Sequence, residues 1–553
     1  MYIPNHDDIN KFLSEAEQQH AMERKSIIPL LQATQRKYGF VPEYAMQKIG
    51  VMLGISSAEV YGVATFYSFI EVEPKGKYHI ALSIDMPSKM AGVDDVAKRL
   101  EKDLGIKMGE TTYDLMFSLE WTGCVGISDM SPAMIINEKI FPSITPEKAS
   151  EIVKKLRHGE PVETEIPQSF TNDLSFDQVE KNSGLKNALE LSPEEVRNLV
   201  KDSGLRGHGG AGFPTGMKWD FCANAEGDKK YVVCNADEGE PGCFKDMLIF
   251  SRFADKVIEG MTVAGYAVGA DEGILYLRWE YAFMKDKLEE ILEEKRAANM
   301  LGNKICGKDD FNFDIRLYFG AGAYVCGEET ALIESIEGHR GEPRNKPPFP
   351  VTDGLFGKPT NVNNVETFAW VPCILAKGSE WYNSAGTENS KGYKLFSISG
   401  DCNKPGVFEL AWGMSLNDIV ELVDAKDPKA IQIGGYSGQL VPKKDFDRVL
   451  SYEDLATGGS VIIFDKSRNL YDIAENYLEF FIEESCGQCT PCRWGNTALL
   501  NHVEKMRQGK ATRKETKDIE TLSETMVLTS KCGLGQTSPN IVKNLMNDFA
   551  DQL

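Results

Sequence analysis

Apolar positions recur with helical spacing over roughly the first 70 residues of the chain. Ser56 and Glu59 form the two ends of a capping box just ahead of the apolar stretch 60–70. Residues 1–75 are therefore predicted to form a small helical bundle.

From residue 78 the pattern changes to short apolar runs separated by a helical period. Strands are predicted over 78–82, 115–119 and 133–136. Between the first two, apolar residues recur every three or four positions, which predicts a helix through Val93, Val96, Leu100 and Leu104. This order suits a small α/β layer over residues 76–160.

A charged and polar stretch, residues 161–187, is predicted to be a linker. The next helix is expected to begin after Ser192, because Glu195 completes a capping box and Pro193 suits the first helical position. The predicted fold class is α/β with several domains. Three domains are predicted after the linker, over 188–390, 391–468 and 469–553.

Composition narrows the class of protein. The chain has 553 residues and a formal net charge of −22 at pH 7, so several domains are expected and binding to nucleic acid or anionic lipid is disfavoured. No apolar run of about 18 residues occurs, and the first residues lack the pattern of a signal peptide. Only Cys124 of the twelve cysteines lies in the first 221 residues, which is unlike a disulfide framework. A cytoplasmic protein with no membrane insertion is predicted.

Four cysteines near the C-terminus carry the strongest chemical signal. Cys486, Cys489 and Cys492 stand at two-residue intervals, and Cys532 follows forty positions later. Three thiolates on one tight loop with a fourth from a remote segment suit a [4Fe-4S] cluster. A structural zinc site or unliganded buried thiols are the alternatives.

A second signal is the glycine-rich segment 204–219. Its glycines let backbone amides approach a phosphate closely, and Lys218 adds a positive charge nearby. Taken alone, the segment could equally be a structural loop. The candidate binding residues here are Gly207, His208, Gly209, Gly210 and Lys218.

Two further loops each follow a predicted strand and are rich in carboxylates, which in α/β folds is where ligands bind. Their carboxylates could accept hydrogen bonds from a cofactor's ribose and would repel the extra phosphate of NADP. Glu328 and Glu329 could instead be stabilising charges at a helix N-terminus. The candidates in these loops are Asn235, Asp237, Glu238, Glu240, Tyr324, Gly327, Glu328 and Glu329.

A fourth segment, residues 346–350, is rich in proline and has one cation and one aromatic residue. A fifth segment, residues 361–367, supplies amide groups. Either could be only a turn. Phe213, Phe221 and Phe349 are candidates to stack on adenine or nicotinamide, although single phenylalanines usually pack in the core. The candidates from the two segments are Lys346, Phe349, Asn363, Asn364 and Thr367.

With these motifs in order, residues 190–553 resemble the NADH-binding flavoprotein subunit of respiratory complex I and its relatives in soluble NAD-linked hydrogenases and formate dehydrogenases. The resemblance implies a Rossmann-like FMN/NADH domain over 188–390, a soluble-ligand-binding β-grasp domain over 391–468 and a helical [4Fe-4S] domain over 469–553. It implies FMN at Gly207, Gly209, Gly210, Lys218, Asn235, Asp237, Tyr324, Gly327, Asn363 and Asn364. It implies NADH at Phe213, Phe221, Glu240, Glu329, Lys346 and Phe349, and the cluster at Cys486, Cys489, Cys492 and Cys532.

One departure stands in the glycine loop, where His208 occupies a position usually held by arginine. A histidine could still donate a hydrogen bond to a phosphate, and its charge would then depend on pH. Residues 529–537 look closer to the soluble hydrogenase branch than to complex I.

The larger departure lies in residues 1–160, which resemble the thioredoxin-like [2Fe-2S] subunit that accompanies this flavoprotein. Residues 60–67 and 76–80 follow its pattern closely. The four cluster positions are Ser83, Ser88, Cys124 and Ser128, so three of four thiolates are replaced by hydroxyls, which are poor iron ligands. This domain is predicted to hold no [2Fe-2S] cluster and to serve as a scaffold or docking surface.

The function implied is an NADH dehydrogenase (diaphorase) subunit that transfers electrons between NAD(H) and a partner redox enzyme through FMN and one [4Fe-4S] cluster. No catalytic side chain is predicted, because the hydride is exchanged on the cofactor. The expected partners are iron–sulfur subunits of a hydrogenase, a formate dehydrogenase or a similar complex. The alternatives are a non-catalytic scaffold derived from such an enzyme and a subunit of an electron-bifurcating complex.

Overall fold

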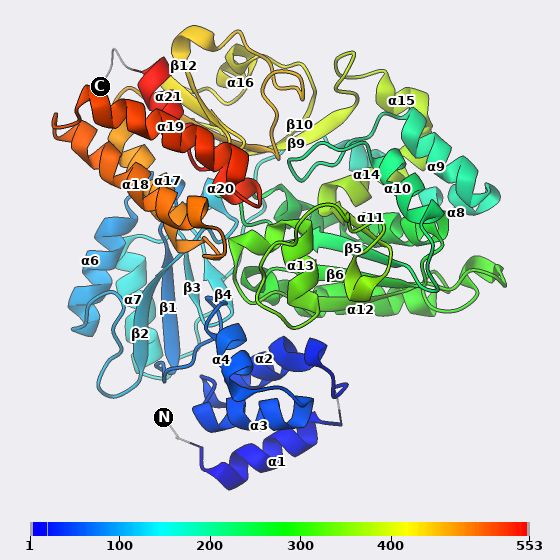
Figure 1. The fold of residues 1–553 in the computed structure, drawn as a ribbon, viewed down its shortest axis with the longest axis horizontal. Coiled ribbons are helices and arrows are strands. Elements are labelled where there is room, and N and C mark those ends of the chain that lie inside the picture. The colour runs from blue at the N-terminus through cyan, green and yellow to red at the C-terminus, as the bar shows by residue number, and fades with distance from the viewer. Residues whose placement is uncertain (1–3, 19, 550–553) are drawn as a thin grey trace. The chain divides into compact units, whose positions relative to one another are not determined.

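The computed structural model describes residues 4–18 and 20–549 (Figure 1). These residues form two compact units. Unit 1 comprises 1–167, 277–283 and 319–343, within the described residues, and unit 2 comprises 168–276, 284–318 and 344–553 within the same limits.

The helical part of unit 1 contains α1 (His6–Ala16), α2 (Ile27–Tyr38), α3 (Glu43–Leu53) and α4 (Ser57–Ala64), with the short 3-10 turn η1 (Arg24–Ser26) before α2. The capping box before α4 is present, since the side chains of Ser56 and Glu59 each accept from the other's backbone amide. Helix α4 ends at Ala64, so the apolar stretch 60–70 continues beyond the helix as a turn, with Tyr67 buried.

The second part of unit 1 is a four-stranded sheet in the order β2-β1-β3-β4, formed by β1 (Tyr78–Ser83), β2 (Phe117–Thr122), β3 (Met134–Ile136) and β4 (Lys139–Phe141). Strand β1 pairs parallel with β2 and antiparallel with β3. Helices α5 (Met86–Met90), α6 (Val93–Leu104) and α7 (Pro146–Arg157) complete this layer, and the apolar faces of α6 and α7 share one core with the sheet. The sheet and helices match the predicted α/β layer.

Strand β2 begins two residues later than the sequence pattern predicts. Leu115 has a left-handed backbone, with φ of 55°, and its amide donates to the carbonyl of Thr112. The apolar residue at 115 therefore closes a turn instead of starting a strand.

Unit 2 contains a sheet in the order β7-β6-β5-β8, formed by β7 (Asp314–Phe319), β6 (Glu272–Leu277), β5 (Tyr231–Ala236) and β8 (Thr360–Asn364). Strands β5 and β8 pair in parallel, from Tyr231 opposite Thr360 to Asn235 opposite Asn364. The carboxyl ends of both strands therefore meet at one edge of the sheet, where the loops with Asp237 and Asn364 begin.

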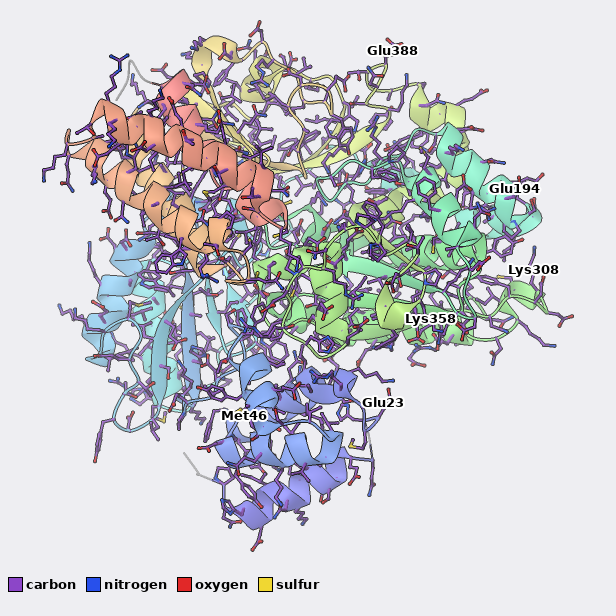
Figure 2. All side chains as sticks on the ribbon, in the orientation of Figure 1. Glu23, Met46, Glu194, Lys308, Lys358 and Glu388 are labelled. Atoms are coloured by element: carbon purple, nitrogen blue, oxygen red, sulfur yellow. The ribbon has the colours of Figure 1, made fainter. Side chains whose placement is uncertain are left out.

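The helices of this region are α8 (Ser183–Glu190), α9 (Pro193–Asp202), α10 (Thr215–Asn224), α11 (Lys245–Val268), α12 (Lys285–Ala297), α14 (Val365–Lys377) and α15 (Ser379–Asn383). The expected capping box of Ser192 and Glu195 begins α9, and Glu194 lies in its first turn (Figure 2). Helices α11 and α14 pack so closely at Gly260 that a side chain there would clash with the backbone of Phe368.

The β-grasp sheet has the order β10-β9-β13-β11-β12, from β9 (Tyr393–Gly400), β10 (Gly406–Ala411), β11 (Pro428–Ile433), β12 (Gln439–Pro442) and β13 (Ser460–Asp465), with helix α16 (Leu416–Leu422). The end of the predicted linker lies along its edge strand β10. Val407 donates its amide to the carbonyl of Phe170, and Asn172 exchanges two hydrogen bonds with the backbone of Glu409. Residues 170–172 thus extend the sheet.

The C-terminal part of unit 2 is helical, with α17 (Leu470–Glu483), α18 (Thr490–Arg507), α19 (Arg513–Thr529), α20 (Gly533–Thr537) and α21 (Asn540–Asp548). Side chains fill the space between these ribbons (Figure 2). Among the described residues, no helix is long and apolar enough to cross a membrane.

Candidate functional site

The glycine-rich segment forms a closed loop between α9 and α10. The amide of Gly207 donates to the carbonyl of Phe213 at 2.9 Å, and the amide of Thr215 donates to the carbonyl of Leu205 at 2.9 Å. Gly210, with φ of 119°, adopts a backbone that residues with a side chain avoid, and a Cβ there would meet no atom within 4 Å. The loop is therefore open on the side of Gly210, as a phosphate cradle requires.

Behind this loop lies a network of fully buried charged groups. His208 Nδ1 is 2.9 Å from Glu366 Oε1, and Lys394 Nζ is 2.8 Å from Glu366 Oε2. Lys245 adds a third contact, with its Nζ 3.3 Å from Glu366 Oε2 and 2.6 Å from Asp246 Oδ1. Two carboxylates thus face two ammonium groups, which offsets the cost of burying them.

The protonation of the network follows from these contacts. Despite burial, the contacts with Lys394, His208 and Lys245 hold the pKa of Glu366 well below its usual range. Burial lowers the pKa of His208, and Glu366 only partly opposes this. The imidazole therefore stays neutral near pH 7, so the pH-dependent charge considered for His208 is not expected there.

Asn363, at the end of β8, has an amide group fixed by its neighbours. Its Oδ1 accepts hydrogen bonds from Trp219 Nε1 and Asn361 Nδ2, both at 3.0 Å. Its Nδ2 donates to no group among the described residues, so this donor is available to a ligand. Lys218, which comes from α10, donates to the carbonyl of Val362 at 2.8 Å on the same strand.

Several of the predicted binding residues also hold the fold together. Asn364 caps α14 through the amide of Glu366 and donates to Asp246 Oδ2 at 2.7 Å. The carboxylate of Glu238 accepts from the amides of Asp246 and Met247 at 2.9 and 3.1 Å. Thr367 Oγ1 accepts the amide of His208 at 2.9 Å. These side chains therefore fix the loops that carry the other candidates.

The remaining candidate carboxylates of unit 2, those of Asp237 and Glu240, lie on the loop after β5. Asn235 Oδ1 accepts the amide of Asp237 at 3.1 Å, which tightens the turn. Glu240 Oε1 accepts the amide of Ser437 at 3.2 Å, and a side chain at Gly435 would clash with Glu240. The β-grasp domain therefore contacts this loop as well.

The aromatic candidates are exposed. Phe213, Phe221 and Phe349 have exposed fractions of 45%, 51% and 52%, and the first two rings lie 6.3 Å apart between centroids. An exposed pair of phenylalanines next to a phosphate-type loop is available for stacking, which core packing would not provide. Lys346, three residues before Phe349, is also exposed.

Four candidates belong to unit 1. Tyr324 and Gly327 lie in the 3-10 turn η6 (Tyr324–Gly327), and Glu328 and Glu329 begin α13 (Glu329–Ile336). Glu328 is the N-cap of α13, because its side chain accepts from the amides of Thr330 and Ala331. These two hydrogen bonds agree with the alternative interpretation of Glu328 as a stabilising charge at the N-terminus of a helix.

The loop and its surroundings fit FMN. The open cradle at Gly210, the unused donor of Asn363 and the nearby Lys218 are groups that bind a phosphate and a polar ring edge.

The four C-terminal cysteines are brought together by the helices. A Cβ on Gly535, three residues after Cys532, would lie 2.8 Å from the Cβ of Cys492. Lys531 Nζ donates to Gln488 Oε1 at 2.7 Å, which links the two cysteine segments. Burial, together with the neighbouring Cys489 and Cys486, raises the pKa of the Cys492 thiol to about 11.

Two hydrogen-bonding groups lie against one of these sulfurs, that of Cys492. Asn496 Nδ2 donates to Cys492 Sγ at 3.6 Å, and Ser485 Oγ lies 3.3 Å from the same atom. Thiolates ligate iron as anions, and such donors stabilise them. The four residues fit a [4Fe-4S] cluster.

Comparisons with known proteins agree with both sites. The family model described as Nuo51 FMN-binding domain matches residues 200–373, and the model described as NADH-ubiquinone oxidoreductase-F iron-sulfur binding region matches 472–553. A third model, thioredoxin-like [2Fe-2S] ferredoxin, matches 13–157.

The NAD-reducing hydrogenase HoxS subunit alpha of Cupriavidus necator is 43% identical to the chain, over 97% of this chain and 92% of that protein. An NADH-quinone oxidoreductase subunit of Aquifex aeolicus is 41% identical, over 68% of this chain and 90% of that protein. A crystal structure of an NAD+-reducing [NiFe]-hydrogenase in the H2-reduced state matches with a TM-score of 0.89 and 35% identity, over 95% of this chain and 91% of that one.

The chain belongs to the family of NADH-oxidising FMN and iron–sulfur subunits of NAD-reducing hydrogenases and complex I. It is thus an NADH:acceptor oxidoreductase subunit, and the family resemblance and the α/β multidomain fold predicted from the sequence are confirmed.

The matching family model for residues 13–157 is described as a thioredoxin-like [2Fe-2S] ferredoxin, and the four positions that the resemblance implies for its cluster lie in unit 1. Ser83, Ser88, Cys124 and Ser128 are all buried. Cys124 Sγ is 3.4 Å from Ser128 Oγ, and Ser128 Oγ donates to Asp85 Oδ2 at 3.2 Å. Asp85 Oδ1 also accepts the amide of Ser88 at 3.0 Å. One thiol and three hydroxyls that bond to protein groups do not fit a two-iron cluster.

Several residues near the glycine loop were not predicted from the sequence. Glu366, Lys394, Lys245 and Asp246 belong to the buried network, and Tyr452 contacts the loop backbone through its hydroxyl. No local motif marks Lys394 or Tyr452. Glu366 lies beside the predicted Thr367 and two positions after the predicted Asn364. A charged residue in the first turn of an otherwise apolar helix is unusual, and this signal could have marked Glu366 as a candidate.

Proposed function

We propose that this subunit transfers electrons between NAD(H) and iron–sulfur partner subunits of a larger redox complex, a hydrogenase, a formate dehydrogenase or a similar enzyme, through FMN and one [4Fe-4S] cluster. One observation carries the proposal: a single chain provides both an open glycine loop with unused donors and four gathered cysteines. When bound, FMN exchanges an electron pair with NADH and single electrons with the cluster.

The residues of this chain bind and orient the reactants. In the proposal the flavin is held by residues of unit 2, namely Gly207, Gly209, Gly210, Lys218, Asn235, Asp237, Asn363 and Asn364, and the roles that the resemblance implies for Tyr324 and Gly327 stay predictions. The nucleotide is held by residues of unit 2, namely Phe213, Phe221, Glu240, Lys346 and Phe349, and the role that the resemblance implies for Glu329 stays a prediction. The exposed aromatic rings support stacking on the nucleotide, and the carboxylates favour NADH over NADPH by repulsion.

The cluster in this proposal has Cys486, Cys489, Cys492 and Cys532 as ligands. Two large apolar side chains next to these cysteines are exposed, Trp494 with 65% and Leu528 with 82% of its surface. Gly495 packs against Met526, so Trp494 and Leu528 lie at the same end of the helix pair α18 and α19. Such exposed residues support docking of a partner subunit at the cluster.

The thioredoxin-like domain, in this proposal, carries no [2Fe-2S] cluster. The support is the single sulfur at its four cluster positions and the hydrogen bonds that satisfy the hydroxyls. The domain then serves as a scaffold or docking surface. A cytoplasmic location is part of the same proposal and rests on the cysteine distribution of the sequence.

An anaerobic assay of the flavin-loaded chain with a one-electron dye tests the function. We expect NADH to reduce the dye and NADPH to do so at least about tenfold more slowly, because repulsion of one added phosphate costs more than about 1.4 kcal/mol. Absence of NADH turnover by protein that holds both flavin and iron would favour the non-catalytic scaffold instead.

A further inference from the structure

The glycine loop rests on the β-grasp domain. Two donors from that domain bond to consecutive carbonyls of the loop: Tyr452 Oη donates to the carbonyl of Gly207 at 3.2 Å, and Lys394 Nζ donates to the carbonyl of His208 at 3.1 Å. A Cβ on Gly458 would lie 3.6 Å from the carbonyl oxygen of Gly209. The loop therefore has a wall of β-grasp residues on one side.

These bonds fix the direction of the loop's amides. A trans peptide is planar, and its N–H points opposite to its C=O. The N–H of His208, opposite the carbonyl held by Tyr452, donates to Thr367 Oγ1 at 2.9 Å. The N–H of Gly209, opposite the carbonyl held by Lys394, points away from the wall and donates to no group among the described residues.

The position of Lys394 makes this orientation strong. Lys394, in strand β9, and Glu366, in helix α14, are both 0% exposed. Glu366 also accepts the amide of Leu395 at 2.7 Å, so the carboxylate that holds the lysine is itself fixed to the strand next to it. A cationic donor on a carbonyl polarises the peptide and makes its N–H a better donor to an anion. Gly209 has no side chain to keep a ligand away from that N–H.

We propose that the β-grasp domain completes the flavin phosphate site, with Lys394 and Tyr452 as positioning residues that turn the Gly209 amide toward the phosphate of FMN. This inference rests on the proposed binding of FMN by the glycine loop and adds to it a role for a domain that holds none of the predicted binding residues.

The test is the preference of the full chain for FMN over riboflavin, which lacks the phosphate. Flavin is removed and the chain is titrated with each flavin by fluorescence quenching. Tyr452→Phe removes one neutral hydrogen bond, so we expect the ratio of the riboflavin Kd to the FMN Kd to fall about two- to tenfold. Lys394→Met removes the charged donor, and the ratio should fall by more than about tenfold.

The control variant is Tyr382→Phe. Tyr382 is a buried tyrosine whose hydroxyl also donates to a carbonyl at 3.2 Å, that of Tyr393, outside the glycine loop. Its ratio should match that of the wild type. Iron content reports whether each variant folds, and if Lys394→Met does not, Tyr452→Phe decides.

Two negative results have different meanings. If the wild type binds FMN and Tyr452→Phe keeps the wild-type ratio, the β-grasp domain does not act on the phosphate site and the inference is wrong. If the wild type binds no FMN, the proposed function itself fails.

Discussion

Two regions of the chain carry four positions each that are predicted to correspond to the ligands of an iron–sulfur cluster, and they differ in the side chains at these positions. In the C-terminal helices all four are cysteines, and three of them are half-buried. In the thioredoxin-like domain one is a cysteine, three are serines, and all four are buried. The first set leaves its sulfurs open to a metal and near the surface, where a partner can receive electrons.

At the serine set, groups of the chain itself supply the hydrogen-bond partners. Ser88, Cys124 and Ser128 are linked through Asp85, and Ser83 Oγ donates to the carbonyl of Gly123 at 3.2 Å. Buried hydroxyls are stable only when they find partners, and this region supplies them from its own chain. The difference between the two sets shows that the donor atoms at the ligand positions, more than the fold that carries them, decide whether a cluster is expected.

The largest expected effect is on the cysteine set. Cys489→Ala removes one of four thiolate ligands, so we expect loss of nearly all of about four irons per chain. Iron analysis of anaerobically purified protein measures this. Cys402→Ala, which changes a half-buried cysteine of the β-grasp domain, is the control and should keep its iron. Equal iron in both variants would contradict the assignment.

The next test restores sulfur to the serine set. The triple variant Ser83→Cys, Ser88→Cys and Ser128→Cys provides four thiols at gathered positions, and we expect about two additional irons per chain. The matched control changes three buried serines of the same unit that lie in different elements, Ser26, Ser118 and Ser150. A gain in the control, or none in the test variant, would show that the four positions do not form one site.

A smaller effect is expected from Asp85→Ala. This change leaves the Ser88 amide and the Ser128 hydroxyl without their acceptor, which costs about 1 to 3 kcal/mol locally. Hydrogen exchange of residues 83–91 measures it. The control is Asp95→Ala, which removes an ion pair with Lys98 that is 74% exposed on both sides and should change little. Similar effects of the two substitutions would mean that Asp85 does not hold the region together.

The smallest effect concerns the attachment of residues 170–175 to the β-grasp sheet. Burial raises the pKa of Glu409 to about 6, although hydrogen bonds from Ser175 oppose the shift. A carboxyl with a pKa above its unfolded value binds protons more tightly when folded. It therefore stabilises the fold as pH falls through 6 toward 4.5, and this stabilisation is lost as pH rises through 6.

Glu409→Gln should remove this pH dependence, about 1 to 2 kcal/mol between pH 7.5 and 5. Hydrogen exchange of residues 170–178, corrected for the intrinsic effect of pH, measures the change. Glu388→Gln, at an exposed glutamate of unit 2 (Figure 2), is the control. A wild-type segment whose protection does not rise on acidification would contradict the raised pKa.

Local signals in the sequence predicted the elements that depend on local contacts. The capping boxes at Ser56 and Ser192 and the helix through Val96 and Leu100 were predicted correctly. Strand β2 was placed two residues early, because an apolar residue at 115 looks the same in a strand and in a left-handed turn.

The candidate site could be predicted only in part. A carboxylate or amide that follows a strand and precedes a helix is expected both for a ligand and for a helix cap, and Glu238, Glu328 and Asn364 have contacts of the second kind; whether they also bind cofactor stays a prediction. Lys394 and Tyr452 were missed because their partners lie 186 and 245 positions away in the sequence.

The most direct test of the account is the iron and flavin content of the wild-type chain after anaerobic purification. We expect about four irons and one FMN per chain, from one cluster at the cysteine set and none at the serine set. About six irons would contradict it by showing that the thioredoxin-like domain holds a two-iron cluster, and no iron with no flavin would contradict the electron-transfer function.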